Sequence, residues 1–341
     1  MAQSSKNDRI FYACQAVAIA PTGTTTLTGA MVAKGVQSVG MTTSFNLEQV
    51  FEFGQIQIYD NVEGVVDVEV TVEKVIDGEK LLYLMGSNNV GKTDLVGATK
   101  ERTDVYLAIY SDAESQIAST NKQSVVMNSG MYINSVSYTY PVDGSATESV
   151  SFAGNDRFWN AVTGGTTIGS PASTNWANGL STGITGSDTP VSGVVRRVDV
   201  DVVGSTLPSI VESQGYDPAT DTLSGGHHLQ SITVSSDFGT ENISELGRFG
   251  PYAKYASFPV EVTCEIEVMA TSGDLVSVSG TAENLASETI IILDQAGTVL
   301  NLGTANKLSS VSYTGGDTGG GNATVTYAYS NFNDLTVQGG G

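Results

Sequence analysis

The sequence repeats itself, and this repeat constrains the fold more than any other feature. Gln37-Ser38-Val39 recurs as Gln230-Ser231-Ile232, and VEVTVE at Val68–Glu73 recurs as VEVTCE at Val260–Glu265. Further matches follow in the same order: Phe45 with Phe238, Gly54 with Gly247, Tyr59 with Tyr252, SVSYT at 135–139 with SVSYT at 310–314, and SVSF at 149–152 with TVTY at 324–327. Matches in one order across most of both halves indicate two copies of one unit.

The repeat also suggests where the chain divides. We expect a first copy at residues 1–159 and a second at 193–341, joined by a connector at 160–192. The connector is rich in Gly, Ser and Thr, and it has too few large apolar residues to form a core. A chain of 341 residues is long enough for two domains of ordinary size, each with its own core.

Alternating apolar and polar residues predict strands at equivalent places in both copies. Val65–Val75 and Pro259–Val268 alternate with a period of two, which is typical of a half-buried strand. Residues 135–152 and 310–327 each contain two alternating runs around a turn rich in Gly and Asp. Each of these segments predicts a β-hairpin.

Helix signals are weak, and they occur in two short segments. Asn46–Phe53 and Thr240–Leu246 are each expected to form a turn or two of helix, one in each copy. Together with the strand pattern, this predicts a mainly β fold. The expected architecture is two tandem domains of the β-sandwich or partial-barrel type, with little helix.

The charge balance excludes one broad class of function. The formal net charge is −21, and no cluster of Lys and Arg appears that would bind phosphates. An acidic surface of this kind either keeps a protein soluble or lines a passage to which polyanions do not adhere.

Cysteine usage and the N-terminus suggest a compartment. Cys14 and Cys264 both lie in apolar runs, which favours two buried thiols in a reducing compartment over a single disulfide. The opening residues MAQSSKNDR contain no hydrophobic signal region, and no apolar run approaches transmembrane length. We expect synthesis in a cytoplasm and a soluble chain until assembly.

One motif resembles that of a nucleotide hydrolase. Gly86–Thr93 (GSNNVGKT) fits the phosphate-binding pattern GxxxxGK[ST], and it follows an apolar run, Leu81–Met85, that would be a strand. Val105–Asp112 (VYLAIYSD) resembles the acidic strand that accompanies such a loop. In a hydrolase, Lys92 would contact the β- and γ-phosphates and Thr93 would help to hold Mg²⁺.

Three observations argue against this interpretation. Thr93–Lys100 is short and contains Gly97, whereas a phosphate loop must open a long helix. The flanking segments indicate β-hairpins rather than a parallel βαβ unit. Asp104–Ile109 also aligns with Glu288–Leu293, and the second copy has no GKT. We therefore expect a loop of variable length that binds no nucleotide and lies in solvent or at a subunit contact.

Other polar clusters are weaker candidates. His227-His228 is interpreted as a loop pair rather than a metal site, because no Cys or carboxylate lies at ligand spacing. Asp199 and Asp201 are expected on one strand face, exposed or at an interface, with a paired-carboxylate site as the weaker alternative. The acidic turn Gly315–Gly321 lacks an ordered Ca²⁺ ligand set. We assign no catalytic, cofactor-binding or metal-binding residues.

Three long stretches together resemble a known family. Val36–Gly78, Ser129–Trp159 and His228–Val268 are similar to the tail tube proteins of double-stranded DNA bacteriophages, particularly the internally duplicated form. The resemblance covers most of the chain outside the connector and the C-terminal tail. It implies flat rings that stack into a hollow cylinder, with sheets of neighbouring subunits closing one inner barrel through which DNA passes.

The resemblance carries further implications. It implies a structural virion protein of the viral tail, not an enzyme, with no cofactor and no membrane partner. Its partners would be copies of itself and other tail proteins, assembled in the host bacterial cytoplasm, and genomic DNA would pass without specific binding. Because such rings ordinarily contain six tube domains, a trimeric pseudo-hexamer is favoured over a hexamer. A β-rich capsid decoration or fibre-like adhesin is the alternative, and a nucleotide hydrolase is third.

Overall fold

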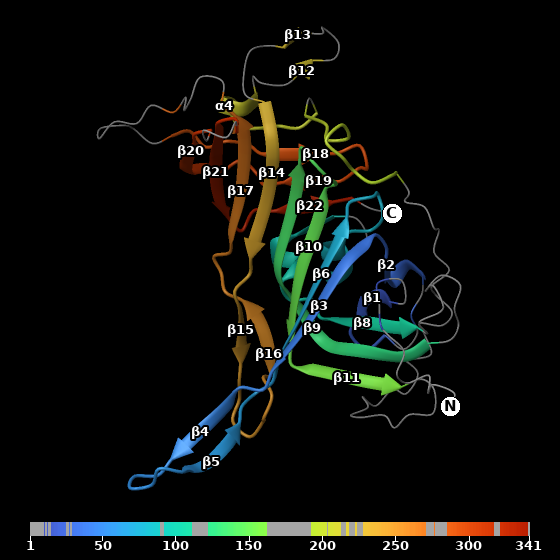
Figure 1. The fold of residues 1–341 in the computed structure, drawn as a ribbon, viewed down its shortest axis with the longest axis vertical. Coiled ribbons are helices and arrows are strands. Elements are labelled where there is room, and N and C mark those ends of the chain that lie inside the picture. Colours follow the sequence, from blue (N-terminus) through green and yellow to red (C-terminus); the bar gives the residue numbers. More distant parts are fainter. Residues whose placement is uncertain are drawn as a thin grey trace.

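Antiparallel strands make up most of the regular structure in the computed structural model (Figure 1). In the first half they are β1 (Gln15–Pro21), β2 (Val32–Ala33), β3 (Val36–Ser44), β4 (Leu47–Phe51), β5 (Ile58–Glu63), β6 (Asp67–Val75), β7 (Lys92–Asp94), β8 (Thr103–Tyr110), β9 (Lys122–Pro141), β10 (Thr147–Gly154) and β11 (Asp156–Ala161). The expectation of a mainly β fold with little helix is confirmed.

The second half continues the same architecture. Its strands are β12 (Tyr216–Asp217), β13 (Thr222–Leu223), β14 (His228–Asp237), β15 (Thr240–Ile243), β16 (Ala253–Ala256), β17 (Glu261–Met269), β18 (Ile291–Leu293), β19 (Val299–Asn301), β20 (Lys307–Thr314), β21 (Thr324–Phe332) and β22 (Thr336–Gln338). The helical segments among the described residues are η3 (Gly29–Met31), α1 (Leu82–Gly86), α2 (Leu95–Ala98) and α4 (Ser209–Glu212).

The structure describes a defined part of the chain, which includes most of both expected copies. The described residues are 10, 12, 15–24, 27, 29–88, 92–110, 122–161, 192–202, 204–212, 216–217, 222–223, 228–270, 276, 285–316 and 321–339. Most of the expected connector lies outside them. The division at residues 159 and 193 therefore stays a prediction.

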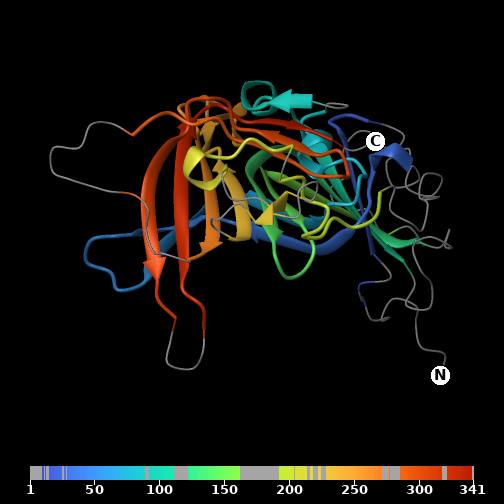
Figure 2. The ribbon, with the colours of Figure 1, turned by 90° about the horizontal axis from the view of Figure 1, so that it is seen from above.

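One continuous sheet runs through both halves. Its strands follow the order β3-β6-β10-β9-β14-β17-β21-β20, and every neighbouring pair is antiparallel. The first four strands come from the first half and the last four from the second, so β9 and β14 form a seam between the halves. Seen from above, the strands of the second half lie together on one side (Figure 2). We call this array the main sheet.

A second layer covers one face of the main sheet. The N-terminal part of β9 leaves the main sheet and pairs with β8 and β11, and β8 pairs with β1. In the second half, β18, β19 and β22 form the corresponding layer, which β7 from the first half extends. The largest buried cluster contains residues of both halves. The halves therefore share a core, whereas the sequence suggested a core for each.

Period-two alternation is clearest on β6 and β17. Val70 and Val72 on β6 and Ile266 on β17 are fully buried, and the intervening residues are carboxylates and threonines. Both predicted hairpins are confirmed, because β9 pairs with β10 and β20 pairs with β21 in antiparallel register. The alternation thus identified strands whose one face lies against the core.

The two short helices expected from the sequence are wrong. Leu47–Phe51 and Thr240–Ile243 are strands that pair with β5 and β16 to form two hairpin arms. Both arms extend from the same end of the main sheet, beyond the ends of β3 and β14 (Figure 1). A cross-strand partner satisfies the backbone better than an isolated helical turn, and Val50, Phe51 and Ile243 have high β-propensity.

Candidate assembly interface

The repeated Gln-Ser motif forms the same β-bulge in both halves. Gln37 is skipped in the pairing of β3 with β6, and Gln230 is skipped in the pairing of β14 with β17. Each amide turns back on its own strand: Gln37 Nε2 donates to the Gly35 carbonyl at 3.2 Å, and Gln230 Nε2 donates to the His228 carbonyl at 3.3 Å. A β-bulge at the same place in β3 and β14 therefore supports the equivalence of these two strands.

The serine after each bulge defines the spatial register of the two halves. Ser38 Oγ donates to Glu73 at 3.1 Å, and Ser231 Oγ donates to Glu267 at 3.2 Å. Glu73 is therefore equivalent in space to Glu267. The match of VEVTVE with VEVTCE instead pairs Glu73 with Glu265, two residues earlier. A shift of two residues keeps every side chain on its face, so the period-two pattern tolerates it.

A second pair of bulges supports the same equivalence. Asn134 is skipped where β9 pairs with β10, and Ser309 is skipped where β20 pairs with β21. Val136 faces Val150 across the first hairpin, and Val311 faces Tyr327 across the second. The four strands of one half thus correspond to the four strands of the other, with the same order and irregularities.

The seam between the halves buries an aromatic residue. Phe238, just after β14, is fully buried, and its ring lies edge-on to Tyr83 of α1 with 6.4 Å between centroids. Its backbone N–H donates to the Asn134 carbonyl at 2.8 Å. Phe45 matches Phe238 in the repeat and follows β3 in the same way, yet its side chain is 63% exposed. The difference arises because β14 has β9 beside it, whereas β3 is at an edge.

Both ends of the main sheet have an unpaired edge among the described residues. β3 pairs with β6 alone, and β20 pairs with β21 alone. Tyr313 near the end of β20 is 57% exposed. These edges correspond to the two strands that meet at the seam, because β3 is the counterpart of β14 and β20 is the counterpart of the C-terminal part of β9. We call β3 and β20 the free edges.

The face of the main sheet that points away from the core is hydroxylic and acidic. Its carboxylates are Asp67, Glu69, Glu73, Asp237, Glu261, Glu265 and Glu267. Serines and threonines occupy most other positions on this face, for example Thr42, Ser137, Thr233, Thr326 and Ser312. Lys307 is the only Lys or Arg among the described strand residues of this face. We call it the polar face.

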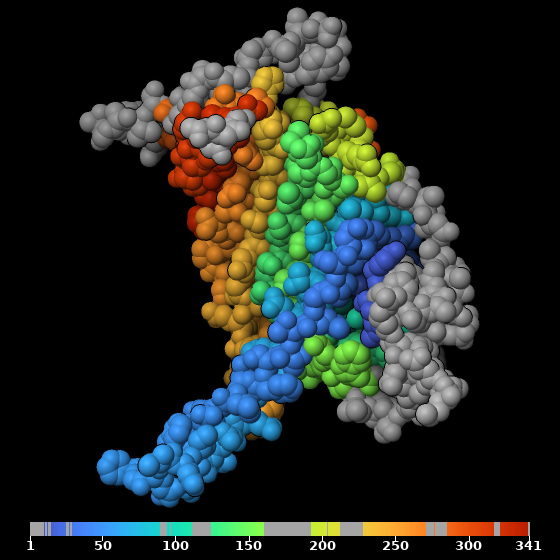
Figure 3. All heavy atoms as spheres, viewed as in Figure 1, coloured from blue at the N-terminus to red at the C-terminus, as the bar shows by residue number. Residues whose placement is uncertain are grey.

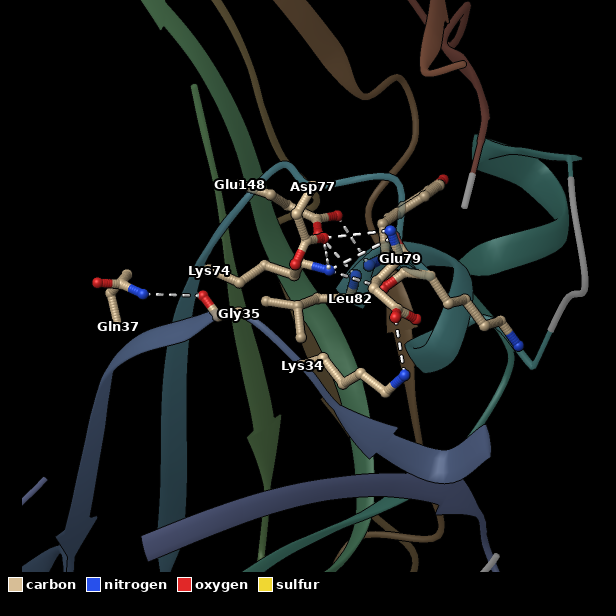
Figure 4. A network of polar contacts seen from close by, with 10 residues as sticks. Lys34, Gly35, Gln37, Lys74, Asp77, Glu79, Leu82 and Glu148 are labelled. Atoms are coloured by element: carbon tan, nitrogen blue, oxygen red, sulfur yellow. Dashed lines mark hydrogen bonds and ion pairs between the residues drawn. The ribbon is translucent and has the colours of Figure 1, made fainter. Parts of the chain in front are cut away.

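A buried charge network holds α1 against the core side of the sheet (Figure 4). Lys74 and Glu148 face each other across β6 and β10, and both side chains are fully buried. Lys74 Nζ lies 3.2 Å from Asp77 Oδ1, and it donates to the Lys80 carbonyl at 3.1 Å. The charge of Lys74 is therefore balanced by a carboxylate and by a backbone carbonyl.

Glu148 receives three hydrogen bonds within this network. The backbone N–H groups of Leu82 and Tyr83 donate to it at 2.6 and 3.0 Å, and the Tyr138 hydroxyl donates at 3.0 Å. Glu148 thereby satisfies amides of the first turn of α1. Burial raises the pKa of Glu148, and the nearby Lys74 charge and these hydrogen bonds oppose that shift.

The second half has an apolar pair where Lys74 and Glu148 face each other in the first half. Val268 and Val325 face each other on β17 and β21, at the positions equivalent to Lys74 and Glu148. Both valines are fully buried. The sequence carried a signal for this buried charge that was missed, since Lys74 has the same parity as the buried valines of β6.

Comparisons with known proteins place few constraints on this chain. No protein-family model matches it, and no curated protein matches it. A chain of an extracellular contractile injection system, the PVC sheath–tube complex in its extended state, is similar at 12% identity with a TM-score of 0.34. A chain of the anti-feeding prophage cap, which terminates the tube, is similar at 12% identity with a TM-score of 0.31. In each case 48% of this chain covers 100% of the other.

The segment that resembles a phosphate-binding loop has a different structure. The apolar run before it is helix α1, not the expected strand, and Lys92–Asp94 form strand β7, not the start of a helix. β7 pairs with β22 of the second half. The strand that resembled an acidic partner, β8, is antiparallel to both of its neighbours. Residues 89–91 and Asp112 lie outside the described residues.

The prediction that Asp199 and Asp201 lie on one face of a strand is also wrong. Both residues lie in a turn-rich segment, where Asp199 accepts from the Arg196 N–H at 2.9 Å and Asp201 accepts from the Gly204 N–H at 2.8 Å. Short acidic side chains often bond to nearby amides in this way, and these bonds favour turns over strands. The two carboxylates therefore stabilise their own loop.

The remaining candidates have no site around them in the described part of the chain. His228 is exposed at the start of β14, and His227 lies outside the described residues, as do Cys14 and part of the turn Gly315–Gly321. Cys264 is a buried free thiol, and burial raises its pKa to about 12. No group of His, Cys, Asp and Glu that could hold a metal ion occurs among the described residues. No described helix is long and apolar enough to cross a membrane.

Proposed function

We propose that this chain is a structural protein whose rings stack into the hollow tube of a phage tail. The observation that carries the proposal is the seam, where two equivalent four-stranded units pair edge to edge and leave matching free edges outside. An unpaired edge is a template for another strand. A chain that joins its own halves through β9 and β14 can join the next chain through β20 and β3.

The exposed phenylalanine supports the same contact. Phe45 follows β3 at the free edge, and its counterpart Phe238 follows β14 at the seam. Only Phe238 is buried. Large apolar side chains that are exposed beside an open strand edge favour association. Pairing of β20 from a neighbouring chain with β3 would cover Phe45 as the first half covers Phe238.

A ring of three chains is the stoichiometry that we propose. Both halves retain the same edge strands, so both would contribute to the ring. Three chains of eight main-sheet strands each would close a barrel of 24 strands. At the usual strand spacing of about 4.8 Å and a tilt of about 40°, the backbone diameter of this barrel is roughly 48 Å, wide enough for a DNA duplex.

The polar face supports passage of DNA without binding. In a closed barrel this face would line the bore, because the other face is covered by the second layer. Carboxylates and hydroxyls repel or only weakly contact phosphates, whereas tight binding requires clustered Lys and Arg. We propose no enzymatic activity. The remaining partners would be other tail proteins, and the site of action would be the virion tail after assembly in the bacterial cytoplasm.

Electron microscopy of the purified protein tests the proposal. We expect rings with three-fold symmetry, in which both halves line the bore, and longer hollow cylinders at higher concentration. Six-fold rings with one half projecting outward would contradict the trimer. A capsid decoration protein or a fibre-like adhesin would instead give separate particles or solid fibres without a bore, and that result would contradict the tube.

Substitution of Phe45 should separate assembly from folding. Phe45→Ala is expected to abolish rings at concentrations where the wild type assembles, with a change in unfolding free energy within about 0.5 kcal/mol, because the side chain is exposed in the single chain. Phe238→Ala is the matched control, and it should lower the unfolding free energy by about 3 kcal/mol or more. Analytical ultracentrifugation and urea unfolding provide the two measurements. Normal ring formation by Phe45→Ala would contradict the proposed contact.

Loss of the lysine in the GKT segment should have no effect on nucleotide affinity, because we propose that no nucleotide site exists there. β7 places Lys92 on a strand, so no helix N-terminus starts at this lysine to bind phosphates. Isothermal titration of the wild type and of Lys92→Ala with Mg²⁺-ATP should show no binding in either protein. Binding to the wild type that disappears in the variant would show that this interpretation is wrong.

A further inference from the structure

The two hairpin arms carry most of the exposed apolar surface at one end of the molecule. The β4–β5 arm projects furthest, as the space-filling view shows (Figure 3). Its tip holds Phe53 and Ile56, whose side chains are fully exposed. Between them, Gly54 has a φ of +92° with open space around it, a conformation that favours glycine in a tight turn.

The base of this arm is fixed to the main sheet. Asn46 donates from Nδ2 to the Val65 carbonyl at 2.8 Å and to Asp67 at 2.7 Å. The Gly64 N–H donates to the Asn46 carbonyl at 3.0 Å, and a Cβ at Gly64 would lie 2.3 Å from that oxygen. The arm therefore has a defined exit from the sheet, and its apolar tip has no partner within the described chain.

The opposite end of the main sheet has an apolar cleft at the seam. The cleft has a volume of about 340 Å³ and lies between the end of β9 and the start of β14. Val142, Val198, Val200, Val202 and Leu229 line it, together with Arg197. β14 starts at this cleft and runs toward the arms, so the cleft and the arms lie at opposite ends (Figure 1). We call it the seam cleft.

The charges of the arm and of the seam cleft are complementary. The arm contains Glu48, Glu52, Asp60 and Glu63, and no Lys or Arg lies between residues 45 and 64. Arg197 is an exposed cation at the seam cleft, and an adjoining hollow adds Arg196 and one acid, Asp143. Only 15 of 341 residues are Lys or Arg, so two adjacent arginines at this place are unusual for the chain.

We propose that the β4–β5 arm of one copy docks in the seam cleft of the next copy along the tube. This inference rests on the proposed function and identifies the contact between rings. Phe53 and Ile56 would enter the apolar cleft, and Glu52 next to the tip would pair with Arg197. An aromatic anchor in a pocket with a charged pair at the rim is a frequent arrangement in protein interfaces.

The geometry also explains why such a contact would continue into a filament. The arm and the cleft are different surfaces at opposite ends, so the contact is heterologous and does not close on itself. The β15–β16 arm is a weaker candidate for this cleft. Its tip acid Glu245 already pairs with Arg248 at 3.6 Å, whereas no cation lies within the β4–β5 arm to pair with Glu52.

A charge exchange tests this contact without altering the core. Arg197→Glu and Glu52→Arg should each shorten the tubes at least tenfold in electron micrographs at physiological salt, while ring mass in native mass spectrometry stays unchanged. The combined variant Glu52→Arg/Arg197→Glu should restore long tubes, because the pair is re-formed with reversed charges. Phe53→Ser/Ile56→Ser should also leave single rings. Arg102→Glu, an equal charge change at an exposed residue before β8, is the control and should leave tube length unchanged.

The outcomes separate this contact from the ring itself. Long tubes from Arg197→Glu, or shortened tubes that the combined variant fails to restore, would overturn the docking of the arm in the seam cleft while leaving the ring intact. Failure of the wild type to form any rings would instead refute the proposed function, and the inter-ring contact with it. Circular dichroism confirms that each variant is folded before assembly is scored.

Discussion

Oxidation of a Thr42→Cys/Ser312→Cys variant is expected to link the assembled protein into covalent species of up to three chains. The expectation follows from the seam, where Ser235 lies directly opposite Ser137. Thr42 is the counterpart of Ser235, and Ser312 is the counterpart of Ser137. If the free edges repeat the seam, the two introduced cysteines face each other on the polar face at a distance suited to a disulfide.

The measurement is a denaturing gel without reducing agent, run on a Cys14→Ser background so that the buried Cys264 is the only native thiol. A ladder of one, two and three chains supports the trimeric ring, and a ladder that continues to six chains contradicts it. Thr42→Cys/Tyr313→Cys is the matched control. Tyr313 is one residue further along, so its side chain points to the opposite face and should not link. Equal linking of both variants would contradict the proposed register between β3 of one chain and β20 of the next.

Removal of Lys74 or Glu148, two buried charged residues that face each other, is expected to destabilise the chain strongly, and removal of both should destabilise it less than the sum of the two single effects. Lys74→Val should lower the unfolding free energy by about 3–5 kcal/mol, because Asp77 loses its ion pair and the buried Glu148 loses the nearby positive charge. Glu148→Val should have an effect of similar size, because Lys74 loses a nearby carboxylate and three buried donors lose their acceptor. The double variant recreates the facing valines that the second half already uses. We expect the sum of the two single effects to exceed the double effect by about 2 kcal/mol or more.

Recovery in the double variant should remain incomplete for a specific reason. The Leu82 and Tyr83 amides and the Tyr138 hydroxyl lose their acceptor when Glu148 is removed. A buried donor without a partner costs about 1–3 kcal/mol. Urea unfolding of unassembled chains at low concentration measures these effects, and strictly additive effects would contradict the coupling. The exposed pair Glu245–Arg248 is the control, with an expected coupling of about 0.5 kcal/mol or less.

The pH dependence offers a second readout for the same group. Because burial raises the pKa of Glu148, the folded chain holds this proton at a pH where the unfolded chain has lost it. The contribution of Glu148 to stability is therefore greatest below the ordinary carboxyl pKa and falls as the pH rises through the raised value. Glu148→Gln should lack this part of the pH dependence.

Much of the strand architecture could be predicted from the sequence alone. Period-two alternation identified the strands that became β6 and β17, and the repeated SVSYT segments identified both hairpins. The repeated Gln-Ser pair marked one place in both halves, where the structure has a bulge. These signals are local, since each depends on residues within one strand or one turn.

Only the tertiary structure decided how these elements meet. The two halves share a sheet and a core, and Lys92–Asp94 form a strand that pairs with the other half. β17 and β21 are displaced by two residues from their sequence match with β6 and β10. Alternation cannot detect a slide of two residues, because every side chain keeps its face. It also cannot assign neighbours, because any strand edge offers the same backbone groups for pairing. Hence Phe45 and Phe238 match in the sequence, whereas strand neighbours far apart along the chain determine that one is exposed and the other buried.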